Sequence, residues 1–228
     1  MTIRAVLFDF SGTLFRLEQD ETWLTDLTDH GGGRLDLEAQ TELMRRMTAP
    51  IGQVVDLDDE HRHAWENRDL DPELHKKVYL KVLQHSGVPR ADQARALYER
   101  LITPTRWTPY PDTDAVLKGS AGKGLRVGVL SNIAFDIRPA FTGRGWDAYV
   151  DEFVLSFEVG AIKPDPAIFR IALERLGVAG EETLMVGDSE EADGGARALG
   201  CAFALVDPLP TAERADGLLA ALRSHGVL

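Results

Sequence analysis

Five short apolar runs constrain the fold of this chain more than any other feature of its sequence. Each holds four to six residues, mainly Val, Leu, Ile or Phe with little polar alternation, which is typical of strands buried on both faces. A clear helical pattern covers Pro166–Leu176, with Asp165 as the expected N-cap and Gly177 as the stop. Alternating strand and helix predicts a doubly wound, parallel, five-stranded α/β sheet. The runs are Ile3–Phe8, Leu125–Leu130, Phe153–Ser156, Thr183–Val186 and Ala202–Val206.

A long helical stretch separates the first of these runs from the second. No strand-like segment appears after Phe8 until Leu125. We therefore predict an all-helical domain over residues 16–104, inserted into an α/β core domain formed by residues 1–15 and 105–228. The linkers Leu14–Leu17 and Ile102–Trp107 would absorb any opening and closing of the two parts. The expected helices of the insertion are Glu21–Leu27, Leu35–Met47, Pro72–His85 and Ala91–Ile102.

Composition narrows the class of protein. The 228 residues include 37 acidic and 25 basic side chains, a net charge of −12. This charge argues against nucleic acid or anionic lipid as a partner. No apolar run approaches a membrane span, and the first run is too short for a secretory signal. A single cysteine, Cys201, excludes an intrachain disulfide and favours a reducing compartment. We expect a cytoplasmic enzyme of small molecules, a monomer or a homodimer.

Polar residues follow four of the predicted strands. The segment Asp9–Thr13 follows the first, Ser131 and Asn132 follow the second, Lys163 lies shortly after the third, and Gly187–Asp193 follows the fourth. Ligands of doubly wound sheets bind beyond the carboxyl ends of the strands. These side chains are therefore expected to converge on one site.

These segments resemble the motifs of the haloacid dehalogenase-like (HAD) hydrolase superfamily. They read DFSGT at Asp9–Thr13, LSN at Leu130–Asn132, GAIKPDPAIF around Lys163 and GDSEEAD at Gly187–Asp193. The likeness continues through GARALG at residues 195–200. It implies a Rossmann-like core, and the helical insertion lies where this family places a cap domain.

The resemblance implies a role for each matching residue. Asp9 would be the nucleophile that forms an aspartyl-phosphate, while Ser131 and Lys163 would stabilise the phosphoryl group. The metal ligands would be Asp9, the carbonyl of Ser11, Asp188 and, directly or through another ligand, Asp193. The substrate would be a small phosphorylated anion, and the residues that line or support its site would be Ser11, Gly12, Thr13 and Asn132.

A charge argument leads to the same metal independently. Asp9, Asp188 and Asp193 bring three negative charges to one site, and Lys163 supplies a single positive one. Neighbouring carboxylates do not all stay ionised without a counter-charge. A divalent cation brings the sum to zero, and Mg²⁺ prefers oxygen ligands while retaining room for water and phosphate. The expected cofactor is therefore Mg²⁺.

Ser11 departs from the family pattern. Phosphatases of the family carry an aspartate at this position, which protonates the leaving oxygen and then activates water. A serine hydroxyl does neither efficiently near neutral pH. Three alternatives follow: a phosphatase that tolerates the loss, a related hydrolase that cleaves phosphonates or haloacids, or a binding protein with weakened catalysis. The motif containing Asp188 argues against haloacid cleavage. Phosphonate cleavage would need a lysine of the insertion, for which Lys76, Lys77 and Lys81 are the candidates.

The insertion offers few markers of substrate specificity. Arg16, Arg45 and Arg46 are candidates for contacting an anionic substrate, although solvated helix positions explain them better. The tryptophans are expected to be packing residues, and Trp107, at the predicted return linker, is the one best placed to contact a substrate. The histidines of the insertion, His75 among them, show no zinc-binding spacing and are expected on its surface or in its core.

Overall fold

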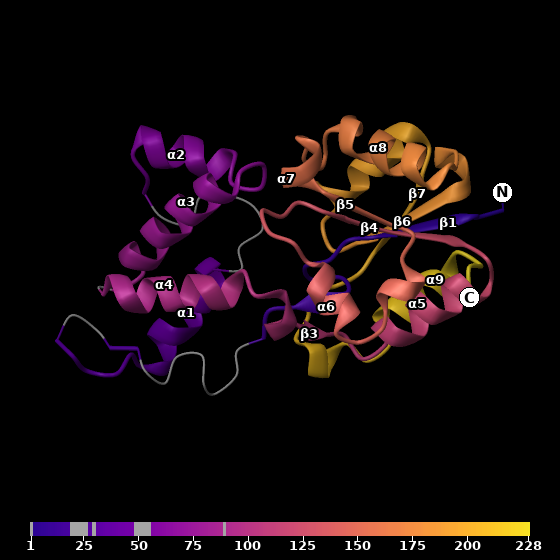
Figure 1. The fold of residues 1–228 in the computed structure, drawn as a ribbon. Helices are drawn as coiled ribbons and strands as arrows, with labels where there is room; N and C mark the ends of the chain where they lie inside the picture. The colour runs from indigo at the N-terminus through magenta and orange to yellow at the C-terminus, as the bar shows by residue number, and fades with distance from the viewer. Residues whose placement is uncertain (1, 19–26, 29–30, 48–55, 89) are drawn as a thin grey trace.

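The computed structural model describes residues 2–18, 27–28, 31–47, 56–88 and 90–228. Its main sheet has five parallel strands in the order β5-β4-β1-β6-β7 (Figure 1). The predicted fold class is confirmed, and each predicted strand is present with ends shifted by at most two residues. The strands are β1 (Ala5–Phe8), β4 (Arg126–Ser131), β5 (Glu152–Leu155), β6 (Thr183–Gly187) and β7 (Ala202–Leu205).

Helices cover both faces of the sheet (Figure 1). Along β1, Val6 and Phe8 belong to one apolar cluster, while Ala5 and Leu7 belong to the other. Successive side chains of a strand point to opposite faces, so both faces of β1 are buried, as its apolar sequence predicts. The first face carries α5 (Thr113–Gly122), α6 (Arg138–Thr142) and α9 (Gly217–Ser224), and the second carries α7 (Ser156–Val159) and α8 (Pro166–Leu176).

Helix α8 begins and ends at the residues that its sequence indicates. A carboxylate oxygen of Asp165 accepts a hydrogen bond from the Ala167 amide at 2.8 Å, which satisfies one of the unpaired donors of the first turn. Pro166 is the first helical residue, and Gly177 closes the helix in the left-handed conformation at φ +67°. The loop that contains Lys163 lies directly before the N-terminus of α8.

Four helices of the insertion lie beyond the carboxyl ends of the strands (Figure 1). Three of the predicted helices are present, and α2 is a helix that the periodicity did not separate from its neighbours. The predicted helix Glu21–Leu27 falls, except for Leu27, outside the described residues. The domain boundaries at residues 15/16 and 104/105 stay a prediction. The four helices are α1 (Leu37–Met47), α2 (Asp59–Glu66), α3 (Pro72–His85) and α4 (Ala91–Leu101).

Two short strands connect the insertion to the core, so the expectation of no strand between Phe8 and Leu125 is wrong. Strand β2 (Phe15–Arg16) pairs antiparallel with β3 (Thr108–Pro109). Strands of two residues are too short to produce a periodic apolar signal, and proline disfavours a strand assignment. Phe15 is fully buried and stacks on Phe10 with ring centroids 4.9 Å apart. The outgoing and returning linkers are therefore fastened together at the core.

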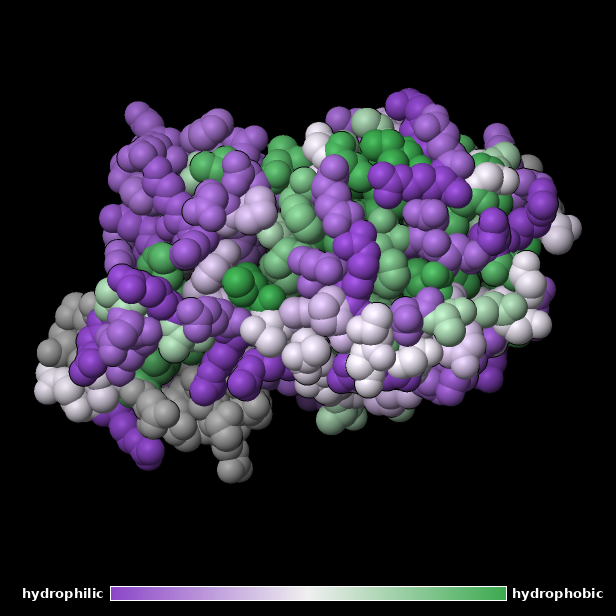
Figure 2. Space-filling model, in the orientation of Figure 1, coloured by the Kyte–Doolittle hydropathy of each residue, from purple (hydrophilic) through white to green (hydrophobic). Residues whose placement is uncertain are grey.

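The face of the molecule drawn in Figure 2 is mostly hydrophilic over α2 and α3, and hydrophobic residues show more often over the α8 side of the sheet. Within the described part of the chain, no helix combines the length and the apolar character needed to cross a membrane.

Candidate active site

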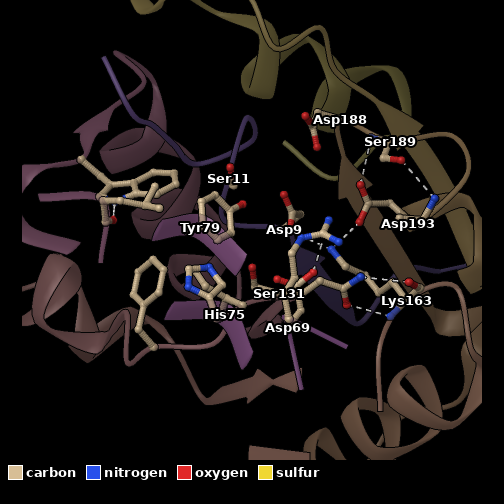
Figure 3. A pocket seen from close by; sticks show the side chains of 17 residues that line it. Asp9, Ser11, Asp69, His75, Tyr79, Ser131, Lys163, Asp188, Ser189 and Asp193 are labelled. Carbon is tan, nitrogen blue, oxygen red and sulfur yellow. Dashed lines mark hydrogen bonds and ion pairs between the residues drawn. The ribbon is translucent and has the colours of Figure 1, made fainter. Parts of the chain in front are cut away.

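The four predicted motifs meet at the carboxyl edge of the sheet (Figure 3). Asp9 follows β1, Ser131 ends β4, and Asp188 follows β6. Strands β4 and β6 are the two neighbours of β1, so parallel pairing brings these residues to one place. Together with Lys163 and Asp193, they line one cavity.

Lys163 is the centre of a buried ionic network. Its Nζ atom lies 2.7 Å from Asp9 Oδ1 and 2.6 Å from Asp193 Oδ1. It also donates to the backbone carbonyl of Leu130 at 3.2 Å. The three charged side chains are at most 7% exposed. One ammonium group therefore bridges two carboxylates out of contact with bulk water.

The electrostatics of this network favour an additional cation. Burial raises the pKa of Asp9, and burial together with the nearby Asp9 carboxylate raises the pKa of Asp188. Burial alone would lower the pKa of Lys163, but the carboxylates of Asp193 and Asp9 outweigh it and raise that pKa. Asp9, Asp188 and Asp193 each offer an oxygen within 4.8 Å of the others. An all-oxygen donor set with surplus negative charge suits Mg²⁺.

Backbone geometry holds the acidic residues close together. Gly12 adopts φ +79°, and a Cβ atom built on it would lie 2.3 Å from Asp188 Oδ2. The Asp188 carboxylate thus packs where any other residue at position 12 would place its side chain. Arg214, which is 5% exposed, donates to the carbonyl of Gly12 at 2.7 Å and also to the carbonyl of Thr13. A residue near the C-terminus therefore fixes the loop after β1, a contact that the sequence did not suggest.

Ser131 and Asn132 differ in what they contact. Ser131 is 1% exposed, and no described residue offers its Oγ a hydrogen bond. Such an unpaired buried hydroxyl is expected to bond to a ligand. Asn132 instead accepts from the Lys163 amide at 2.7 Å and donates to the Lys163 carbonyl at 2.9 Å. Asn132 therefore positions the lysine loop.

Ser11 lies at the cavity with an exposed side chain. It therefore brings a hydroxyl, and no carboxyl group, to the cavity at this position. Thr13 is fully buried, and its Oγ1 has no hydrogen-bond partner among the described residues.

The opposite wall of the cavity comes from the insertion, and its residues escaped sequence reasoning (Figure 3). The Arg68 guanidinium lies 4.1 Å from the Trp65 ring centroid, and its Nη1 donates to the Trp65 carbonyl at 2.6 Å. In the sequence, Arg68 and Asp69 show only as an adjacent pair of opposite charges in the connection between two helices. The cavity-lining residues of the insertion are Arg68, Asp69, His75, Tyr79 and Leu101.

His75 is a buried core histidine, as expected, that also faces the cavity. Its Nδ1 lies 3.0 Å from the Tyr98 hydroxyl, and its ring stacks on Tyr79 with centroids 4.3 Å apart. Burial lowers the His75 pKa to about 3, so the ring is neutral at physiological pH. Trp107, the tryptophan of the return linker, also lines the cavity and donates its indole proton to the Leu101 carbonyl at 2.8 Å.

The arginines suggested by the sequence lie elsewhere. Arg45 and Arg46 both pair with Glu42 on α1, at 2.7 and 2.6 Å, and neither lines the cavity. Arg16 donates to the carbonyl of Pro208 and lies in a recess beside Ser11 and Asp188. Of the three, only Arg16 is near the acidic residues.

Comparison with known proteins agrees with these motifs. The chain matches the family model described as haloacid dehalogenase-like hydrolase over residues 3–200. It is 36% identical over 135 residues to a phosphoserine phosphatase of Thermus thermophilus, a match that covers 58% of this chain and 54% of that protein. The chain thus spans about half the length of this relative.

Solved structures show that the fold is shared by enzymes of different chemistry. A HAD phosphatase from Thermococcus onnurineus has a TM-score of 0.54 at 24% identity, covering 90% of this chain and 86% of its own. The L-2-haloacid dehalogenase of Xanthobacter autotrophicus has a TM-score of 0.62 at 25% identity, covering 96% and 83%. The fold alone therefore does not select a reaction. With the family model matched over most of its length, this chain belongs to the haloacid dehalogenase-like hydrolases.

Proposed function

We propose that this protein is a magnesium-dependent phosphatase that transfers the phosphoryl group of a small anionic substrate to Asp9. The observation that carries the proposal is the acidic triad of Asp9, Asp188 and Asp193 beside Lys163 and the unpaired hydroxyl of Ser131. This arrangement supplies a nucleophile, a cation site and donors to phosphoryl oxygens at one point. The phosphatase named among the relatives supports the same chemistry.

In the proposed first step, a carboxylate oxygen of Asp9 attacks phosphorus, and the bond from phosphorus to the leaving oxygen breaks. Lys163 holds the Asp9 carboxylate in place and offsets negative charge. Ser131 donates its proton to a phosphoryl oxygen. Asp9, Asp188, Asp193 and the carbonyl of Ser11 would hold Mg²⁺, which when bound neutralises charge on the phosphoryl oxygens. Water then cleaves the aspartyl-phosphate and restores Asp9.

The alternative chemistries have less support from the cavity. Haloacid cleavage needs no metal, so it gives no role to Asp188, whose pKa burial and Asp9 raise. Phosphonate cleavage through a lysine imine would need a lysine of the insertion in the cavity. None of the candidates Lys76, Lys77 and Lys81 lines it, and Lys77 pairs with Glu60 instead.

We also propose that residues 16–104 act as a cap that sets substrate choice. Arg68 brings a cation to the cavity, Tyr79 and Leu101 bring apolar surface, and Trp107 of the return linker extends that surface. A substrate with an anionic group and a small apolar part fits such a wall. Closure of the cap would exclude water from the aspartyl-phosphate before its hydrolysis.

The test is turnover of p-nitrophenyl phosphate and acetyl phosphate with Mg²⁺, compared with an Asp9→Asn variant and with wild type in EDTA. We expect wild-type turnover with Mg²⁺ and a loss of activity in both controls. Wild-type rates no higher than those of Asp9→Asn would refute a catalytic phosphatase. Turnover of a 2-haloacid or a phosphonate in place of both phosphates would assign the site to one of the other chemistries.

A further inference from the structure

We infer that Asp69, supplied by the helical insertion, is the general acid that protonates the leaving oxygen in place of the aspartate missing at Ser11. The inference rests on the proposed phosphatase function and adds a catalytic residue to it. It also predicts a wider substrate class, because an acid in the cavity allows alkyl phosphates, whose leaving groups need a proton, to react.

The carboxylates around the cavity differ in what they contact. Four of its described lining residues carry one: Asp9, Asp69, Asp188 and Asp193. Three of them form the acidic triad, and two of these also bind Lys163. Asp69 is the remaining carboxyl group of the described lining, and the triad leaves it available for another task.

Asp69 also lies on the side of the cavity opposite the nucleophile. Phosphoryl transfer places the attacking and leaving oxygens roughly in line on opposite sides of phosphorus. Asp9 attacks from the floor of the cavity at the sheet edge, so the leaving oxygen points toward the insertion. Asp69 lies in the wall on that side, and Figure 3 shows it in the lining with Asp9 and Ser131.

The core fixes the backbone of Asp69. Ser156 Oγ lies 2.5 Å from the Asp69 carbonyl and accepts a hydrogen bond from the Ile133 amide at 2.8 Å. Ser156 is fully buried directly after β5, as the first residue of α7, and Ile133 comes two residues after Ser131. One hydroxyl therefore ties the segment bearing Asp69 to the core wall that carries Ser131. An acid must be positioned this firmly to act on a reacting atom.

The surroundings of Asp69 suit an acid better than those of its neighbours. Its side chain is 20% exposed, and burial raises its pKa, opposed by the Arg68 guanidinium at 3.8 Å and by Lys163. The other titratable groups facing it are the Tyr79 phenol, whose pKa burial raises, and neutral His75. The low pKa of His75 leaves its ring without the acidic imidazolium proton at neutral pH. Asp69 is thus the group that exchanges a proton most readily in this wall.

The proposed step balances. As the Asp9 oxygen bonds to phosphorus and the phosphorus–oxygen bond of the ester breaks, the protonated Asp69 carboxyl transfers its proton to the departing oxygen, which leaves as an alcohol. Asp69 is then a carboxylate. It accepts a proton from the water that attacks the aspartyl-phosphate, so that phosphate departs and both aspartates return to their starting states.

The experiment compares Asp69→Asn with wild type in single turnovers of two substrates. p-Nitrophenyl phosphate has a leaving group that departs without a proton, whereas glycerol 2-phosphate has an alkoxide. We expect Asp69→Asn to slow release from the alkyl phosphate by about 10²–10⁴-fold, the usual size of general acid–base catalysis. The burst of p-nitrophenolate should change by less than about 10-fold. The matched control is Asp59→Asn, an exposed aspartate of α2, which should change neither rate.

Two further variants separate acid catalysis from structural damage. Asp69→Glu retains a carboxyl group and should recover part of the alkyl phosphate rate, which also covers a failure of Asp69→Asn to fold. Ser11→Asp restores the family residue and should rescue alkyl turnover in the Asp69→Asn background. The inference is overturned if Asp69→Asn slows both substrates equally, if it slows neither, or if wild type acts on p-nitrophenyl phosphate alone. Wild-type inactivity on both esters would instead overturn the phosphatase function beneath it.

Discussion

Replacing Gly12 by alanine should weaken cation binding at the acidic triad in addition to destabilising the fold. Gly12 adopts φ +79°, and the left-handed backbone costs an alanine about 1–2 kcal/mol. A Cβ at this position would also lie 2.3 Å from Asp188 Oδ2 and 2.7 Å from its Cγ. Ordinary contact begins near 3.4 Å, so the carboxylate must retreat by about 1 Å.

A displacement of 1 Å is large for a metal ligand, because Mg²⁺ holds its oxygens at about 2.0–2.1 Å in a strict geometry. Disturbing groups that only orient a metal ligand already weakens metal affinity by about 10–100-fold. We therefore expect at least about 10-fold weaker Mg²⁺ binding in Gly12→Ala, measured by calorimetry and by the Mg²⁺ dependence of turnover. Unfolding in urea would report the accompanying loss of stability.

Gly124→Ala is the matched control for this measurement. Gly124 has φ +74°, but no atom of the described residues lies within 4 Å of a Cβ built on it. It should lose a similar 1–2 kcal/mol of stability to backbone strain while binding Mg²⁺ as wild type does. Equal Mg²⁺ affinity in the two variants would refute the packing of Gly12 against Asp188 as the reason for the glycine.

Two further predictions concern stability. Because the His75 pKa falls to about 3 on folding, its contribution is present above pH 6.5 and is lost as the pH falls below that value. Between pH 6.5 and 5, the unfolding free energy should therefore fall less steeply in His75→Phe than in wild type, by up to about 1.4 kcal/mol per pH unit. Unfolding free energies from urea that fall with pH in parallel for the two proteins would contradict this. Phe141, fully buried against the rings of Phe15 and Phe153 at 5.2 and 5.0 Å, should lose about 3–5 kcal/mol as Phe141→Ala. Leu37→Ala, at a side chain 74% exposed, should stay within about 0.5 kcal/mol of wild type in the same assay.

The sheet and the floor of the site were predictable because their signals are local. A strand buried on both faces must be apolar throughout, so β1 and β6 stand out as runs of such residues. Parallel pairing then brings Asp9 and Asp188 to one edge without further information. Helix α8 was predictable to the residue because Asp165 and Gly177 satisfy the unpaired backbone groups at its two ends.

The far wall of the cavity was not predictable in this way. Arg68, Asp69 and His75 face the cavity because of how the insertion is seated over the carboxyl edge of the sheet, where the Ser156 hydroxyl contacts the Asp69 carbonyl. No local periodicity encodes that placement, and a charged pair between two helices is as common on a solvated surface. The contact of Arg214 with the carbonyl of Gly12 likewise joins residues far apart in the chain. Long-range contacts of this kind depend on the assembled fold.

In the proposed mechanism, a serine at position 11 and an acid at Asp69 make the chemistry depend on the position of the cap. An acid at position 11 would move with the loop of the nucleophile and would be present whether the cap was open or closed. Asp69 belongs to the insertion, and its backbone is held at the core through Ser156. Protonation of the leaving group then requires that the insertion be seated on the core. That condition also shields the aspartyl-phosphate from bulk water, so the same contact that completes the acid–base chemistry excludes solvent from the site.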